Sequence, residues 1–110
     1  MSTRIDEIKE IVALSPGDPF PLYGLAMEYR NSGDLNQAKS TFATLAERFP
    51  AYVPQYLMHG QLLANDLKDR AAAKRVLEAG MEHARTARNH HALSEMQSLY
   101  DRLDEDDDAV

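Results

Sequence analysis

Four histidines are the residues of this sequence best suited to bind a metal or to transfer a proton at neutral pH. They stand at positions 59, 83, 90 and 91. A zinc-binding pair on one helix needs residues three or four positions apart, and no two of these histidines have that spacing. We therefore expect His59 to be a partly buried packing residue and predict no metal site. A metal-binding or enzymatic role for the histidines is a minor alternative.

The other groups that enzymes use for chemistry are missing from the 110 residues. There is no cysteine, which excludes a thiol nucleophile, thiolate ligands and disulfides together. We find no glycine-rich phosphate loop, no serine nucleophile elbow and no paired carboxylates beside an apolar cleft. The sequence therefore predicts a protein that is not an enzyme and needs no cofactor. A chain without disulfides suits a reducing compartment, so we expect a cytoplasmic protein.

The net charge of −6 argues against a nucleic-acid partner. Five of the 18 acidic residues form one run, Asp104–Asp108, and without it the chain is close to neutral. A block of like charge cannot bury itself, so we expect residues 104–110 to be a disordered acidic tail. That tail either keeps the protein in solution or docks on a basic partner. No apolar run of about 18 residues and no signal peptide is found, which predicts no membrane partner.

Turn and capping residues divide the chain into about six short helices. Thr3, Asp18 and Asp34 can each accept hydrogen bonds from the first free backbone N–H groups of a helix. Gly33 can adopt the left-handed conformation that ends a helix, and no segment alternates with the two-residue period of a strand. The expected helices begin near residues 3 and 19, after Asp34, near residue 53, after Asp69 and near residue 87.

A 34-residue period relates these helices to one another. A shift of 34 places Ala38 on Ala72 and Phe42 on Val76. Identity between the copies is low, but small residues meet small ones where helices approach closely, and large apolar residues meet large ones where gaps are filled. Internal repetition of this kind favours a stack of helical hairpins over a simple bundle.

Residues 19–52 carry large and small apolar residues at fixed spacings, namely Leu22-x-x-Leu25-Ala26-x-x-Tyr29, then Ala38-x-x-x-Phe42, then Pro50. This pattern resembles the tetratricopeptide repeat family. Residues 53–86 form a degenerate second copy, in which His59 occupies a position that is usually aliphatic and the inter-helix turn lacks a glycine. Residues 3–16 match the second helix of a repeat, and residues 87–103 match the first.

The resemblance implies an all-α protein, a right-handed stack of antiparallel helix hairpins of the α-solenoid type. One domain is expected over residues 1–103, made of a half repeat (3–16), two repeats (19–52 and 53–86) and a capping helix (87–103). The family binds a peptide or helix of a partner protein in a concave groove lined by the first helix of each repeat. The sequence therefore favours a non-catalytic interaction module or adaptor.

The family's groove positions fall on an unusually apolar set of residues: Phe20, Tyr23, Met27, Arg30, Asn31, Leu57, Met58, Gln61 and Asn65. In the last half repeat they fall on Arg88, His91, Glu95 and Ser98. Aromatic and methionine side chains supply contact area for an apolar or mixed ligand. Two alternatives are open: Phe20 and Tyr23 pack under the first helix while Met27 fills a gap, or the exposed ends of the array form a homodimer.

Overall fold

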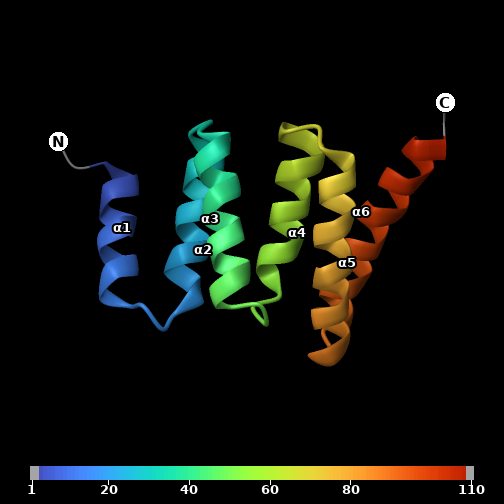
Figure 1. The fold of residues 1–110 in the computed structure, drawn as a ribbon. Helices are drawn as coiled ribbons and strands as arrows, with labels where there is room; N and C mark the ends of the chain where they lie inside the picture. Colours follow the sequence, from blue (N-terminus) through green and yellow to red (C-terminus); the bar gives the residue numbers. More distant parts are fainter. Residues whose placement is uncertain (1–2, 109–110) are drawn as a thin grey trace. The chain divides into compact units, whose positions relative to one another are not determined.

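The computed structural model describes residues 3–108, and every regular element within them is helical (Figure 1). The elements are α1 (Arg4–Leu14), α2 (Pro19–Asn31), α3 (Leu35–Arg48), α4 (Pro54–Gln61), the π-helix η1 (Leu62–Asp66), α5 (Arg70–Thr86) and α6 (His90–Asp108). The prediction of an all-helical chain is confirmed. No helix in this range is long and apolar enough to cross a membrane.

Side-chain caps determine where the helices begin. Thr3 and Asp6 form a reciprocal capping box at the start of α1, with N···O distances of 3.1 and 3.3 Å. Asp34 and Asp69 each accept a hydrogen bond from the backbone N–H three residues further on, at 3.3 and 3.1 Å. Gly33 closes α2 with a φ of +87°, the left-handed conformation expected of it.

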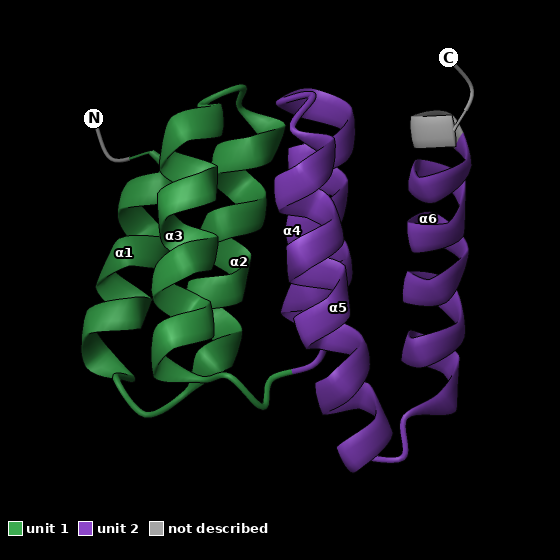
Figure 2. Cartoon of the chain, turned by 45° about the vertical axis from the view of Figure 1, so that its right-hand side comes forward, with its two compact units in different colours: residues 1–52 green, residues 53–110 purple. Residues whose placement is uncertain are grey.

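The helices form two compact units, residues 1–52 and residues 53–110 (Figure 2). In unit 1, α2 packs against both α1 and α3. In unit 2, α5 packs against both α4 and α6, and α4 also contacts α6. The boundary between the units lies between residues 52 and 53, where we expected one repeat to end and the next to begin.

Unit 1 is held together by the apolar faces of α2 and α3. The buried residues are Leu22, Leu25, Ala26 and Tyr29 on α2 and Ala38, Thr41, Phe42 and Leu45 on α3. Phe42 and Leu45 have no exposed surface. In contrast, α1 has no buried residue at all.

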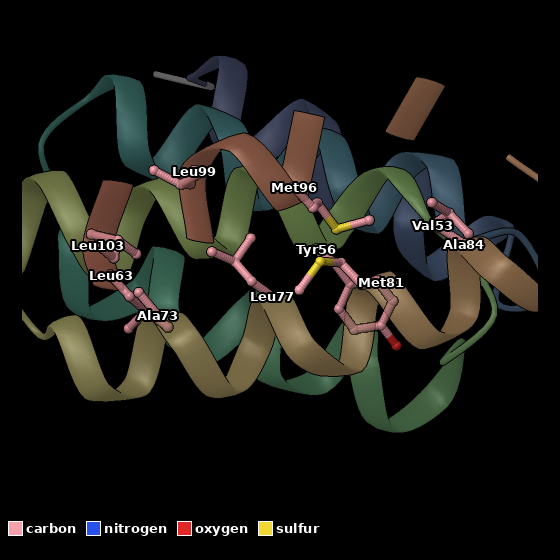
Figure 3. Packing of buried hydrophobic residues seen from close by; sticks show 10 residues of the cluster. All are labelled: Val53, Tyr56, Leu63, Ala73, Leu77, Met81, Ala84, Met96, Leu99 and Leu103. Atoms are coloured by element: carbon pink, nitrogen blue, oxygen red, sulfur yellow. The ribbon is translucent and has the colours of Figure 1, made fainter. Parts of the chain in front are cut away.

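Unit 2 has a core of ten residues, contributed by α4 and the residue before it, η1, α5 and α6: Val53, Tyr56, Leu63, Ala73, Leu77, Met81, Ala84, Met96, Leu99 and Leu103 (Figure 3). Two glycines let the helices approach closely. A Cβ on Gly80 would lie 2.3 Å from the Cβ of Tyr56 and 2.6 Å from the Sδ of Met96. A Cβ on Gly60 would lie 2.7 Å from the Cδ2 of Leu77.

The π-helix η1 changes the spacing of the second repeat from 34 to 35 residues. Asp34 N–H donates to the carbonyl of Tyr29, five residues back, whereas Asp69 N–H donates to the carbonyl of Leu63, six residues back. One residue has therefore been inserted, and the wider turns of a π-helix accommodate it. Lys68 takes the place of Gly33 in the turn, with a φ of +56°.

The inserted residue corrects our register for α5. Ala73 and Leu77 are the fully buried counterparts of Ala38 and Phe42, not Ala72 and Val76. The last two are only half-buried and lie at the edge of the core. The 34-residue shift failed here because it assumed an uninterrupted α-helix up to the turn.

Helix α6 differs from its predicted limits at both ends. It begins at His90 rather than near residue 87, after Asn89, whose Oδ1 accepts a hydrogen bond from the N–H of Ala92 at 3.1 Å. It continues to Asp108, through the run that we expected to be disordered. Neither glycine nor proline interrupts the run, and Lys74 on α5 pairs with Asp104 at 2.6 Å. Residues 109–110 lie outside the described range.

Candidate functional site

A surface pocket of about 310 Å³ lies between α4 and α6 in unit 2. Its lining residues are Leu57, Gln61, His91, Ser94, Glu95, Ser98, Leu99 and Arg102. Five of these, Leu57, Gln61, His91, Glu95 and Ser98, are positions that the sequence assigned to the groove. The structure therefore brings together residues of α4 and α6 that are at least 30 positions apart in the chain. We call this the α4–α6 pocket.

Polar groups dominate the rim of the α4–α6 pocket. His91 Nε2 lies 2.8 Å from Glu95 Oε1, one turn further along α6, so the two side chains hold each other. Gln61, Ser94 and Ser98 add amide and hydroxyl groups that can both donate and accept hydrogen bonds. Such groups suit the backbone of a bound peptide, and the pocket is more polar than we expected.

Sequence reasoning missed three lining residues, Ser94, Leu99 and Arg102. A signal was available, because Ser94 and Arg102 lie on the face of α6 that already carries His91, Glu95 and Ser98, at spacings of three and four residues. Leu99 is largely buried and forms part of the core beneath the pocket.

Three predicted groove residues of unit 2, Met58, Asn65 and Arg88, lie outside the α4–α6 pocket. Arg88 is exposed in the turn between α5 and α6, with a φ of +55°. Met58 is half-buried on α4. Asn65 lies in η1 and lines a separate cavity of about 460 Å³ with Ala64, Lys68, Arg70 and Leu103. The structure thus keeps Asn65 apart from Leu57 and Gln61.

In unit 1, Tyr23 is part of an aromatic cluster. Its ring meets Tyr52 edge-on at 5.6 Å and Phe42 at 6.5 Å between centroids. Burial raises the pKa of Tyr23, and burial together with the nearby Tyr23 and Asp18 raises that of Tyr52. Tyr23 therefore helps to hold α2, α3 and the segment after α3 together, as well as presenting a partly exposed ring.

The other predicted residues of unit 1 divide between two surfaces. Met27 and Arg30 are half-buried on α2, and Asn31 is exposed at its end. Phe20 is 67% exposed and lines an apolar groove of about 280 Å³ with Arg4, Ile8, Ile11, Pro21 and Gly24. We call this the α1–α2 groove. Phe20 thus faces α1. This agrees in part with the alternative that Phe20 packs under the first helix.

The histidines do not form a metal centre in the described part of the chain. His59 is buried, with 8% of its surface exposed. His83 stacks on the ring of Tyr56, with centroids 5.4 Å apart and an interplanar angle of 9°. Within residues 3–108, no group of three or more histidine, aspartate or glutamate side chains is placed to hold a metal ion.

Comparison with known proteins identifies the family through solved structures. Neither a family model nor a curated protein matches the chain. The solution structure of a tetratricopeptide repeat domain protein from Salinibacter ruber is 32% identical, with a TM-score of 0.75 over 80% of this chain and 88% of the other. This chain belongs to the tetratricopeptide repeat family. The crystal structure of a tetratricopeptide repeat domain protein from the same organism is 31% identical, with a TM-score of 0.74 over 79% of this chain and 97% of the other.

A third structure, of a Bordetella parapertussis protein, is 20% identical and supports the fold alone. Its TM-score is 0.80, over 97% of this chain and 92% of the other. The tetratricopeptide repeat fold is in general a protein–protein interaction module without catalytic activity. In this tetratricopeptide repeat protein, five of the predicted groove residues, on α4 and α6, line a single pocket.

Proposed function

We propose that this tetratricopeptide repeat protein is a non-catalytic adaptor that binds a peptide or helix of a partner protein on the first helices of its repeats. The observation that carries the proposal is the α4–α6 pocket. Five of its lining residues occupy the family's groove positions, and its mixture of leucine, hydroxyl, amide and charged groups suits a peptide with both apolar and polar side chains.

The charge of the α4–α6 pocket favours a ligand without a strong net charge. Glu95 and Arg102 contribute one acid and one base, and Leu57 and Leu99 contribute apolar surface. Apolar contact is insensitive to salt, whereas attraction between exposed charges is screened. We therefore expect affinity for the partner to change little between low and physiological ionic strength. The lack of cysteine supports an action in the cytoplasm, and we propose neither a nucleic-acid nor a membrane partner.

The test compares partner binding by the wild-type protein and by a Leu57→Ala/Gln61→Ala variant. Partners are captured from an extract of the source cells, and affinity is then measured with the purified partner. Truncating two central contacts should weaken binding by more than about 2 kcal/mol. An Arg75→Ala variant is the matched control, because Arg75 is exposed on α5 and lies outside the pocket.

Unchanged binding by the Leu57→Ala/Gln61→Ala variant, with its helical circular dichroism spectrum intact, would contradict the proposal. Met27→Ala is the suitable probe for unit 1, where Met27 is half-buried on α2. Tyr23→Ala is a poor probe there, since loss of the ring contacts with Tyr52 and Phe42 would also destabilise the unit.

A further inference from the structure

The apolar side of α1 is left largely uncovered. Ile11 is 49% exposed and Leu14 is 83% exposed, although both follow Ile8 at three-residue steps along the helix. With Phe20, Ile11 and Leu14 are the exposed large hydrophobic residues of the described chain. Ile8, Ile11 and Phe20 line the α1–α2 groove. Exposed apolar surface gathered in one place marks a contact surface.

Helix α3 shows how the same positions are covered one repeat later. A step of 34 residues carries Ile8 onto Phe42 and Ile11 onto Leu45. Both of these α3 residues have no exposed surface, because α2, the first helix of the same repeat, packs over them. The apolar face of α1 therefore has the sequence of a face that a first helix covers.

Unit 2 repeats the arrangement a second time. A further step of 35 residues leads from Phe42 to Leu77 and from Leu45 to Gly80 on α5. Both α5 residues are covered by α4, since the space beside Gly60 is filled by Leu77 and the space beside Gly80 by Tyr56. Helix α4 also contacts α6. It thus packs on the two helices that correspond to α1 and α2 of unit 1.

Leu14 fits the same relation. The two steps carry it to His83, whose ring stacks on Tyr56 of α4 at 5.4 Å. All three apolar residues along α1 thus correspond to residues that face α4 in unit 2. Within unit 1, no helix of the described residues occupies the equivalent place on α1 and α2.

We propose that the α1–α2 groove binds an amphipathic helix of a partner protein, which lies antiparallel to α1 and completes the open half repeat. The orientation follows from α4, where Tyr56 meets Gly80 and the later Gly60 meets the earlier Leu77. The bound helix needs a small residue opposite Ile8, as Gly60 lies opposite Leu77.

The chemistry of the occupant follows from α2, which covers two large residues on α3. Its buried residues are Leu22, Leu25, Ala26 and Tyr29, a large, large, small, large pattern. Ile11 corresponds to Gly80 in unit 2, which lies opposite Tyr56, but to Leu45 in unit 1. The residue of the bound helix opposite Ile11 is therefore better an aliphatic residue than a tyrosine. A second copy of this chain is a poor occupant, since α2 and α4, its helices with this pattern, bury those faces within their own units.

The probe is a fluorescently labelled synthetic peptide with the sequence of residues 17–33, which includes the cap Asp18 and the terminating Gly33 of α2. Anisotropy should show saturable binding to the full-length protein, and amide cross-peaks of α1 and α2 should shift in NMR spectra. Ile11→Glu should weaken binding at least tenfold, because it places a carboxylate in the apolar groove. Ala13→Glu, which adds the same charge to an exposed position on α1, should leave binding unchanged.

A peptide in which Ala26 is replaced by glutamate should fail to bind, since the small position opposite Ile8 is lost. Absence of binding by the parent peptide, or equal binding to the Ile11→Glu and Ala13→Glu variants, would overturn the proposal. So would a dimer in light scattering that Ile11→Glu converts to a monomer, because the groove would then hold a second copy. Leu57→Ala/Gln61→Ala should not affect this peptide, so the outcome is independent of the α4–α6 pocket.

Discussion

Replacement of Gly80 by alanine should destabilise unit 2, although alanine is the better helix former. The new Cβ would lie 2.3 Å from the Cβ of Tyr56 and 2.6 Å from the Sδ of Met96, whereas carbon atoms in contact are about 3.5–4.0 Å apart. Met96 can change its rotamer. The Cβ of Tyr56 is fixed to the backbone of α4, so the helices must separate by about 1 Å or more.

The expected cost follows from two opposing effects. Overpacking of a well-packed core costs about 1–3 kcal/mol, and replacing a helical glycine by alanine recovers up to about 1 kcal/mol. Because the backbone-linked contact cannot relax by side-chain rotation, we expect a net loss of about 1–2 kcal/mol for Gly80→Ala. Gly60→Ala should cost less, since the nearest atom is the mobile end of Leu77.

The matched control is Gly24→Ala in α2. A Cβ on Gly24 would meet nothing within 4 Å, so the helix propensity should stabilise unit 1 by about 0.5–1 kcal/mol. Urea denaturation followed by circular dichroism at constant m-value gives the free energies of unfolding. Gly80→Ala as stable as the parent, or more stable than Gly60→Ala, would refute the close packing of α4 on α5.

Three further substitutions test the register and the aromatic cluster. In urea denaturation, Leu77→Ala should lower the free energy of unfolding by about 2–5 kcal/mol and Val76→Ala clearly less, because only Leu77 is fully buried. A larger loss for Val76→Ala would support the 34-residue register instead. Lys68→Gly should raise the free energy of unfolding by up to about 1 kcal/mol, because glycine adopts a φ of +56° without strain. An unchanged free energy of unfolding would contradict the left-handed conformation of residue 68. Burial, Tyr23 and Asp18 raise the pKa of Tyr52, so its stabilising contribution is complete below pH 10 and is lost as the pH rises through its folded pKa. Tyr52→Phe should therefore lose less stability between pH 9 and 11 than the parent, and an identical loss would contradict that assignment.

The first repeat could be read from the sequence because its signals are local. Asp18, Asp34 and Gly33 act on the backbone within three residues, so their capping roles do not depend on distant contacts. Apolar residues at helical spacing then determine which face of α2 and α3 is buried. The exposure of the apolar face of α1 could not be predicted in this way, because burial depends on whether another helix packs on that face.

The register of α5 was missed although the sequence carried a sign of it. Asp34 and Asp69 are 35 residues apart, and both cap a helix. The offset was obscured because Lys68, rather than glycine, takes the left-handed conformation before the cap. A non-glycine residue at positive φ is uncommon, so sequence reasoning gave no reason to align Lys68 with Gly33.

The position of the π-helix explains why Asn65 does not lie with Leu57 and Gln61 in unit 2. Leu57 and Gln61 precede η1, so a 34-residue step from the first repeat still places them correctly on α4, and both line the α4–α6 pocket. Asn65 lies inside η1, where the extra residue alters the angular position of each side chain, and it lines a different cavity. Helix α5 starts anew at the Asp69 cap and recovers a regular apolar face, displaced by one residue. One inserted residue can therefore remove a single side chain from a binding surface while the core on both sides of it is kept, since the caps allow each helix to set its own register.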